Sequence, residues 1–206
     1  MERERDKGLG RDRPIEPSRT ALLVVDVQNW GLDAASDQHS AAFLEAFWGH
    51  VVPNLERLID AARGAGIEVV YTVVENETQD GRDRSLDYKL TGFFVAKGSV
   101  EAQVIDQLAP GPDELVIPKT SSSLFNSTNF DYLMRNIGID TIIATGVLTD
   151  QCVDHTIRDG ADRGFYMICA SDACCTESPA RHEAALSGFG GYCRTLTTDE
   201  LLAAIA

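Results

Sequence analysis

Short apolar runs alternate with longer segments of helical periodicity along this chain of 206 residues. Residues 21–26 form a nearly continuous apolar run, as expected of a strand buried on both faces of a parallel sheet. Other strand-like runs lie at 67–73, 114–118, 140–145, 165–170 and 192–195. Helices are predicted at 41–63, about 99–108, 128–137, 150–162, 179–188 and after Thr197. This alternation predicts an α/β, Rossmann-like three-layer fold, with a six-stranded, mostly parallel sheet flanked by helices.

Interruptions of the pattern indicate how the chain is divided. Pro53 is expected to kink or split the helical segment 41–63, and the glycines at 64 and 66 to end it. Residues 75–98 read as a long polar loop, which in a compact domain usually has a function. Residues 1–18, with mixed charge and two prolines, are expected to be a mobile or oligomer-contacting arm. No internal repeat or linker divides residues 19–206, so we expect one domain there.

Charge and cysteine content restrict the partners and the location of the protein. A net charge of −14 disfavours nucleic acid and anionic membranes, although one local Lys or Arg could still hold an anionic substrate. No apolar run approaches the ~18–20 residues that span a bilayer. The five cysteines are irregularly spaced and form no CxxC pair, which favours reduced thiols in a cytoplasmic protein over a disulfide scaffold.

Three residues that could take part in catalysis lie at the ends of strand-like runs. Asp26 ends the first run, Lys119 the third, and Cys152 comes just after the fourth, in the predicted first turn of a helix. Strand ends converge in a doubly wound sheet, and the start of a helix favours a thiolate. A carboxylate could accept the thiol proton while a lysine stabilises both anions. Taken singly, each has an ordinary alternative: a buried cysteine, a turn aspartate, a surface lysine.

The segments around these residues resemble the three signature segments of the isochorismatase-like cysteine hydrolases. Asp26 lies in residues 22–29, Lys119 in 118–128 and Cys152 in 146–153, and the resemblance covers roughly 18–196. It implies that 19–206 is an isochorismatase-like hydrolase domain. It also implies that Asp26 is the general base and that Cys152 forms a thioester acyl-enzyme. Lys119 would stabilise the carboxylate–thiolate arrangement and help to orient the substrate.

The same resemblance implies an oxyanion hole and a reaction class. A cis peptide is expected at Val147–Leu148, where it would direct the N–H groups of Leu148 and Cys152 at the oxyanion. Members that cleave a vinyl ether lack the thiol, so Cys152 favours hydrolysis of a small amide, carbamoyl or ureide substrate. Isochorismatase-type vinyl-ether hydrolysis and a non-catalytic binding protein on the same scaffold remain alternatives.

Other positions complete the predicted site. Residues 72–78 contain no histidine where nicotinamidases carry an Asp/His metal cluster, so we expect neither a metal nor a cofactor. His155 is interpreted as a packing or polar contact, and Cys169, Cys174 and Cys175 as buried thiols rather than a redox cluster. By position, the candidate substrate contacts are Gln28, Trp30, Thr72, Glu75, Asn76 and Phe125. A homodimer or homotetramer is expected, as is common in the family.

Overall fold

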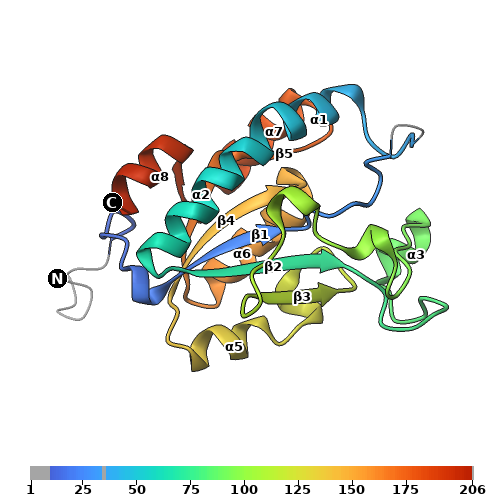
Figure 1. The fold of residues 1–206 in the computed structure, drawn as a ribbon, viewed down its shortest axis with the longest axis horizontal. Helices are drawn as coiled ribbons and strands as arrows, with labels where there is room; N and C mark the ends of the chain where they lie inside the picture. The colour runs from blue at the N-terminus through green and yellow to red at the C-terminus, as the bar shows by residue number, and fades with distance from the viewer. Residues whose placement is uncertain (1–9, 34–35, 206) are drawn as a thin grey trace.

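Six parallel strands form the centre of the computed structural model, which describes residues 10–33 and 36–205 (Figure 1). Their order across the sheet is β3-β2-β1-β4-β5-β6, and each adjacent pair is parallel. The bounds are β1 Thr20–Val25, β2 Glu68–Val74, β3 Leu115–Lys119, β4 Thr141–Val147, β5 Tyr166–Cys175 and β6 Arg194–Leu196. The predicted α/β fold is confirmed, and the sheet is entirely rather than mostly parallel.

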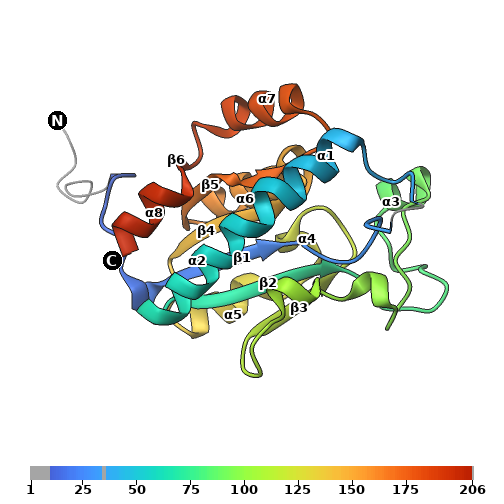
Figure 2. The same cartoon turned by 45° about the horizontal axis from the view of Figure 1, so that its top comes forward.

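Helices cover both faces of the sheet (Figure 2). Those on one face are α1 Ala41–Ala46, α2 Val52–Ala65 and α8 Thr198–Ile205. Those on the other are α4 Leu124–Ser127, α5 Phe130–Asn136, α6 Asp154–Asp162 and α7 Pro179–Phe189. The side chains of β1 alternate between the two cores, with Leu22 and Val24 in the first and Leu23 and Val25 in the second. Burial on both faces explains why this strand is apolar throughout.

Two helical predictions needed correction. The predicted helix at 99–108 is wrong: the segment forms two short 3₁₀ turns, Val100–Ala102 and Asp106–Leu108. Val104 pairs with Gln28 in an isolated antiparallel bridge between these turns, and this pairing is incompatible with a continuous helix. The loop at 75–98 also contains a helix, α3 Leu86–Thr91, whose N-terminus is capped by the Ser85 side chain.

The helical segment after residue 40 is divided, as expected. A π-helical turn, Phe47–Val51, lies between α1 and α2, and the backbone stays helical through it. Pro53, which has no N–H to donate back into this turn, lies in the first turn of α2. Gly66 ends α2 in the left-handed region, at φ 75°. The glycine stop signal therefore had the predicted effect.

Close packing between the central strands fixes the position of the strand ends. Gly146 in β4 has φ 99°, and a Cβ atom there would lie 2.2 Å from the carbonyl oxygen of Val25 in β1. Only glycine permits this approach. Val25 directly precedes Asp26, so the contact holds the carboxyl ends of β1 and β4 together. The predicted functional residues lie at these strand ends.

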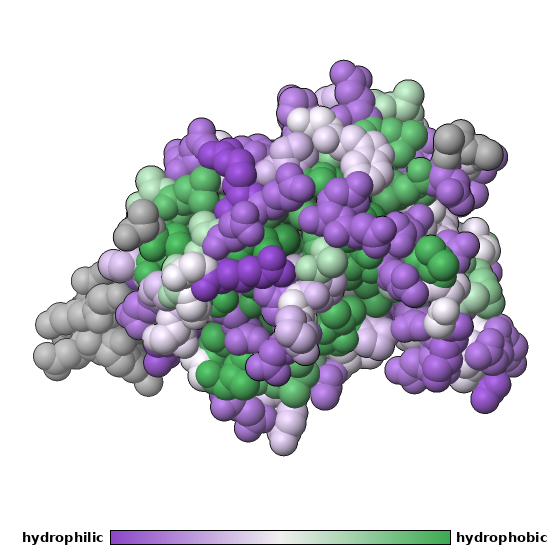
Figure 3. Space-filling view, in the orientation of Figure 1, coloured by the Kyte–Doolittle hydropathy of each residue, from purple (hydrophilic) through white to green (hydrophobic). Residues whose placement is uncertain are grey.

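The outer parts of the fold bear on the remaining predictions. In the predicted arm, residues 1–9 lie outside the described residues, whereas Arg13 forms an ion pair with Asp140 and lies over the ring of Tyr166, 3.6 Å from its centroid. The face shown in Figure 3 mixes hydrophilic and hydrophobic side chains. Within the described residues, no helix is long and apolar enough to cross a membrane.

Candidate active site

Asp26 follows β1 and is held in position by two buried partners. Its backbone has φ 54°, a left-handed conformation that aspartate and asparagine adopt more readily than most residues. One carboxylate oxygen accepts a hydrogen bond from Thr72 Oγ1 at 2.8 Å. The other forms an ion pair with Lys119 Nζ at 2.8 Å. The carboxylate is therefore fixed, and its charge is balanced.

Lys119 is the last residue of β3 and is completely buried. Besides Asp26, its ammonium group contacts Cys152 Sγ at 3.2 Å and the carbonyl oxygen of Ser121 at 3.0 Å. Burial is the largest influence and would lower the pKa of Lys119, but Asp26, Cys152 and Tyr88 together outweigh burial, so the pKa is raised well above its usual value. Lys119 is thus a permanent positive charge between a carboxylate and a thiol.

Cys152 lies in the π-helical segment Thr149–Val153 that follows β4 and leads into α6. Burial raises the pKa of its thiol to about 12; Lys119 acts in the opposite direction, whereas Asp26 adds to the increase. The expectation that the helix start would favour a thiolate is therefore wrong, because the loss of hydration on burial outweighs the nearby positive charge. Cys152 is a thiol at neutral pH, so attack requires a base.

The raised pKa predicts an unusual alkylation profile. Only the thiolate reacts with iodoacetamide, and its fraction should increase about tenfold per pH unit up to a pKa far above the ordinary ~8.5. We expect the alkylation rate of Cys152, followed by peptide mass spectrometry, to increase up to the highest pH at which the fold persists. Glutathione under the same conditions should level off near pH 9. A Cys152 profile that levelled off there too would contradict the prediction.

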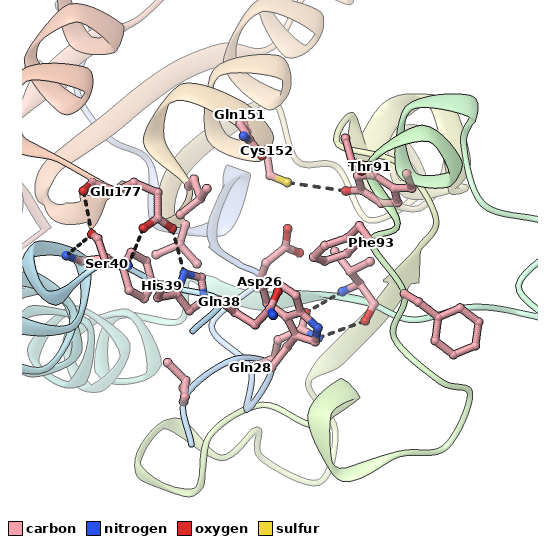
Figure 4. A pocket seen from close by; sticks show the side chains of 18 of the residues that line it. Asp26, Gln28, Gln38, His39, Ser40, Thr91, Phe93, Gln151, Cys152 and Glu177 are labelled. Atoms are coloured by element: carbon pink, nitrogen blue, oxygen red, sulfur yellow. Dashed lines mark hydrogen bonds and ion pairs between the residues drawn. The ribbon is translucent and has the colours of Figure 1, made fainter. Parts of the chain in front are cut away.

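A cavity of about 940 Å³ opens at these strand ends (Figure 4). Asp26 and Cys152 lie in its wall, and the tilted aromatic rings of Trp30, Tyr88 and Phe93 line one side. The other lining residues are Gln28, Leu32, Asp37, Gln38, His39, Ser40, Phe43, Phe47, Val74, Asp87, Thr91, Gly92, Phe94, Val147, Leu148, Gln151 and Glu177. The cavity is large enough for a small organic molecule that reaches the thiol.

The predicted substrate contacts divide into two groups. Trp30 and Gln28 line the cavity, but both ends of the Gln28 amide are occupied by the backbone: Nε2 donates to the carbonyl of Val74 at 3.0 Å, and Oε1 accepts from the N–H of Val74 at 2.6 Å. Thr72, behind Asp26, orients its carboxylate. Gln28 and Thr72 therefore support the site rather than meeting the substrate through free polar groups.

Three other predicted contacts do not line this cavity. Glu75 accepts a hydrogen bond from the N–H of Gly98 at 2.6 Å and borders a separate surface hollow. Asn76 is buried, and its N–H donates to the carbonyl of Val95. Phe125 packs in the second core. Proximity to strand ends was the argument for all three, but the chain turns away from the cavity at each of them.

Several cavity residues had no detectable sequence signal. His39 Nδ1 lies 2.8 Å from Glu177 Oε1, although 138 positions separate them in sequence. Glu177 also accepts a hydrogen bond from the N–H of Ser40 at 2.8 Å, so it secures the loop that precedes α1. Tyr88 belongs to α3, in a segment interpreted from the sequence as loop, and its hydroxyl lies 4.0 Å from Cys152 Sγ.

Tyr88 leads to a second prediction. Burial raises the pKa of its phenol well above the usual value, so the hydroxyl remains a hydrogen-bond donor close to the thiol. We expect Tyr88→Phe to lower kcat of the hydrolysis proposed below about tenfold while the free energy of unfolding changes by less than about 1.5 kcal/mol. Steady-state kinetics and urea titration measure both quantities. Tyr132→Phe, at an exposed position on α5, is the control. Equal kcat values in the two variants would contradict this role.

The remaining sequence interpretations concern histidine, cysteine, metal and backbone geometry. His155 Nδ1 lies 2.9 Å from the carbonyl oxygen of Gln151, a polar contact within its own helical segment, and does not line the cavity. Cys169, Cys174 and Cys175 are buried free thiols. Among residues 10–33 and 36–205, no three His, Cys, Asp or Glu side chains are grouped to hold a metal. The Val147–Leu148 peptide is cis, as the resemblance implied.

Comparison with known proteins places these features in a family. The fold is of the doubly wound α/β class, and its cavity lies at the carboxyl ends of the strands, where such folds bind their ligands. Residues 20–200 match the isochorismatase domain, and the chain belongs to the isochorismatase family. Ureidoacrylate amidohydrolase RutB of Pseudomonas syringae pv. syringae is 32% identical over 178 residues, covering 77% of this chain and 71% of the relative.

Solved structures agree with this assignment. A cysteine hydrolase from Pseudomonas syringae pv. phaseolicola superposes with a TM-score of 0.84 at 28% identity, covering 94% of this chain and 95% of the other. N-carbamoylsarcosine amidase from Thermoplasma acidophilum superposes with a TM-score of 0.71 at 26% identity, covering 88% and 97%. The similarity therefore extends over nearly the whole fold.

Proposed function

We propose that this protein is a cysteine amidohydrolase that cleaves a C–N bond of a small amide, carbamoyl or ureide substrate through a thioester acyl-enzyme. The observation that carries the proposal is the convergence of three side chains at one cavity: Lys119 Nζ lies 2.8 Å from the Asp26 carboxylate and 3.2 Å from the Cys152 sulfur. The relatives named ureidoacrylate amidohydrolase and N-carbamoylsarcosine amidase support the reaction class.

The first half of the reaction forms the acyl-enzyme. Cys152 is a protonated thiol in the unliganded site, so Asp26 takes its proton as the sulfur attacks the carbonyl carbon. Lys119 compensates the negative charge during this transfer. The N–H groups of Leu148 and Cys152, at the start of the helical segment beside the cavity, are the proposed donors to the oxyanion. The tetrahedral intermediate then collapses, and Asp26 returns the proton to the departing ammonia or amine.

The second half regenerates the thiol. Water attacks the thioester carbonyl while Asp26 accepts one of its protons. The C–S bond then breaks, the acid product leaves, and the proton passes to the sulfur of Cys152. Both halves use the same base, the same cation and the same oxyanion donors. Every step of the proposed mechanism uses side chains and N–H groups of this chain.

Release of ammonia from a panel of small primary amides, carbamoyl compounds and ureides tests the proposed function. We expect at least one compound to be hydrolysed and its rate to depend on Cys152. Products formed from chorismate-derived vinyl ethers are measured in parallel. Vinyl-ether cleavage without any ammonia release would favour isochorismatase-type chemistry, and inactivity toward both sets would favour a binding protein.

We also propose a homodimer or homotetramer in the cytoplasm. Leu86 and Leu90, one helical turn apart on α3, are 71% and 77% exposed at the cavity end of the molecule, as expected of a surface that another copy covers. The proposed arm at residues 1–18 is a second candidate contact. Five unpaired thiols agree with a reducing compartment. Mass measurement in solution tests the assembly, and a monomer at micromolar concentration would contradict it.

A further inference from the structure

The outer part of the cavity is built from aromatic rings. The ring centroids of Trp30 and Phe93 are 4.6 Å apart, and those of Phe93 and Tyr88 are 4.7 Å apart. His39 continues this wall: its ring meets that of Trp30 edge to face, with a centroid distance of 5.4 Å, and stacks on Phe43 at 3.9 Å. A substrate whose carbonyl reaches Cys152 would extend its distal end along these rings, toward the part of the cavity where Figure 4 shows His39 and Phe93. Aromatic faces are electron-rich and attract cations.

The charged groups at the cavity are predominantly carboxylates. Asp26, Asp37, Asp87 and Glu177 line it, and the described lining residues include no Lys or Arg. Lys119 neutralises Asp26, and Glu177 is occupied by His39 and Ser40. Asp37 and Asp87 are exposed and form no ion pair with any described residue. The entrance therefore carries two uncompensated negative charges.

Two basic side chains of the segment that carries Tyr88 and Phe93 have other partners. Arg84 donates to the carbonyls of Gly81 and Phe93 and lies over the outer ring of Phe94. Lys89 donates to the carbonyl of Arg82. Neither lines the cavity. The single local cation that could have held an anionic substrate is thus not found among the described lining residues.

The charge of this cavity does not suit the substrates for which the relatives are named. Ureidoacrylate and N-carbamoylsarcosine each carry a carboxylate, which needs a cationic partner. In this cavity a substrate carboxylate would face Asp37, Asp87 and aromatic rings, and would lose hydration without gaining a Lys or Arg partner among the described lining residues. A cationic group in the same place would gain both the rings and the carboxylates.

We propose that the substrate is an amide or ureide whose distal end is a cation, such as an ammonium or guanidinium group. This inference rests on the proposed function, because it assumes that the carbonyl end is the one that reaches Cys152. Trp30, Phe93, Asp37 and Asp87 then select the distal end, whereas Asp26, Lys119 and Cys152 act on the carbonyl.

Three matched ureas test the charge preference: (2-aminoethyl)urea, propylurea and 3-ureidopropanoate, which share a ureide and a two-carbon chain and end in ammonium, methyl and carboxylate. Binding to the Cys152→Ala protein is measured from the NMR shift of the Trp30 indole N–H, a readout that does not depend on turnover. We expect the ammonium probe to bind about tenfold more tightly than propylurea, and the carboxylate probe more weakly than either. The preference should decrease at 1 M salt.

Variants that remove one carboxylate at a time identify the residues that cause the preference for the ammonium probe. Asp37→Asn and Asp87→Asn should each reduce the ammonium-to-propyl affinity ratio about two- to fivefold. Asp113→Asn changes the net charge equally, but Asp113 lies just before β3, at the other end of that strand from Lys119 and from the cavity. It should leave the ratio unchanged. Equal or tighter binding of the carboxylate probe, or no Trp30 shift with any probe, would overturn the inference. Ammonia release from any compound in a Cys152-dependent manner would still support the proposed function.

Discussion

Replacing Cys152 with alanine should lower the rate of ammonia release by about 10⁴-fold or more while the protein remains folded. The expected effect is large because the thiol forms the covalent bond of the proposed acyl-enzyme. Substituting one buried sulfur by hydrogen is a modest change to the core, so circular dichroism and the unfolding midpoint should stay near those of the unmodified protein.

A matched control separates chemistry from packing. Cys193 is equally buried, but its thiol contacts the carbonyl of Phe189 in the second core, away from the cavity. We expect Cys193→Ala to hydrolyse substrate within about twofold of the unmodified rate. Acid quenching during turnover, followed by intact mass spectrometry, should show an acyl adduct on Cys152. Unchanged hydrolysis by Cys152→Ala would exclude the proposed mechanism.

Replacing Asp26 with asparagine should damage both catalysis and stability. The amide fits the left-handed backbone at this position and fills the same volume, but it cannot accept the thiol proton, so kcat should decrease about 10³-fold or more. The ammonium group of Lys119 would remain fully buried without a counter-ion. Removing one partner of a buried ion pair typically costs about 3–5 kcal/mol.

Urea titration and ammonia release measure these two effects. The stability loss should be larger than for Asp113→Asn, an exposed control in which the same chemical change is expected to stay within about 0.5 kcal/mol. The double variant Asp26→Asn, Lys119→Met should recover part of the stability, because it removes the uncompensated charge, but none of the activity. Recovery of activity without the carboxylate would contradict the role of Asp26 as the base.

The architecture was predictable because it depends on local pattern. A strand buried on both faces must be apolar throughout, and β1 shows this directly. The proline and glycine around α2 are local signals of the same kind, because they indicate where a helix begins and ends. The predicted helix at 99–108 failed because the backbone pairing of Val104 with Gln28 is a long-range contact that overrides local preference. Helix α3 was missed because it is a single short helix within a polar segment and depends on its Ser85 cap.

The site was predictable to a different extent in its two parts. Asp26, Lys119 and Cys152 could be found because strand ends of a parallel sheet must meet, so position in sequence implies proximity. The contact of Glu177 with His39 joins two loops 138 positions apart, and that of Tyr88 with Cys152 joins two short helical segments 64 positions apart. No periodicity in the sequence predicts that these segments meet. The thiol pKa was misjudged for a related reason: burial depends on the complete packing, which a linear sequence does not display.

The location of the two groups of residues has a consequence for engineering this scaffold. Asp26, Lys119 and Cys152 follow strands that the sheet and both cores hold rigid, whereas Trp30, Asp37, Asp87 and Phe93 belong to loops, or to a short helix within one. Surface loops tolerate replacement far better than buried strands. Libraries confined to residues 29–40 and 77–98, with Tyr88 retained because its hydroxyl lies beside the thiol, should therefore alter the accepted molecules without unfolding the protein. New specificities could then be selected on an unchanged reaction centre.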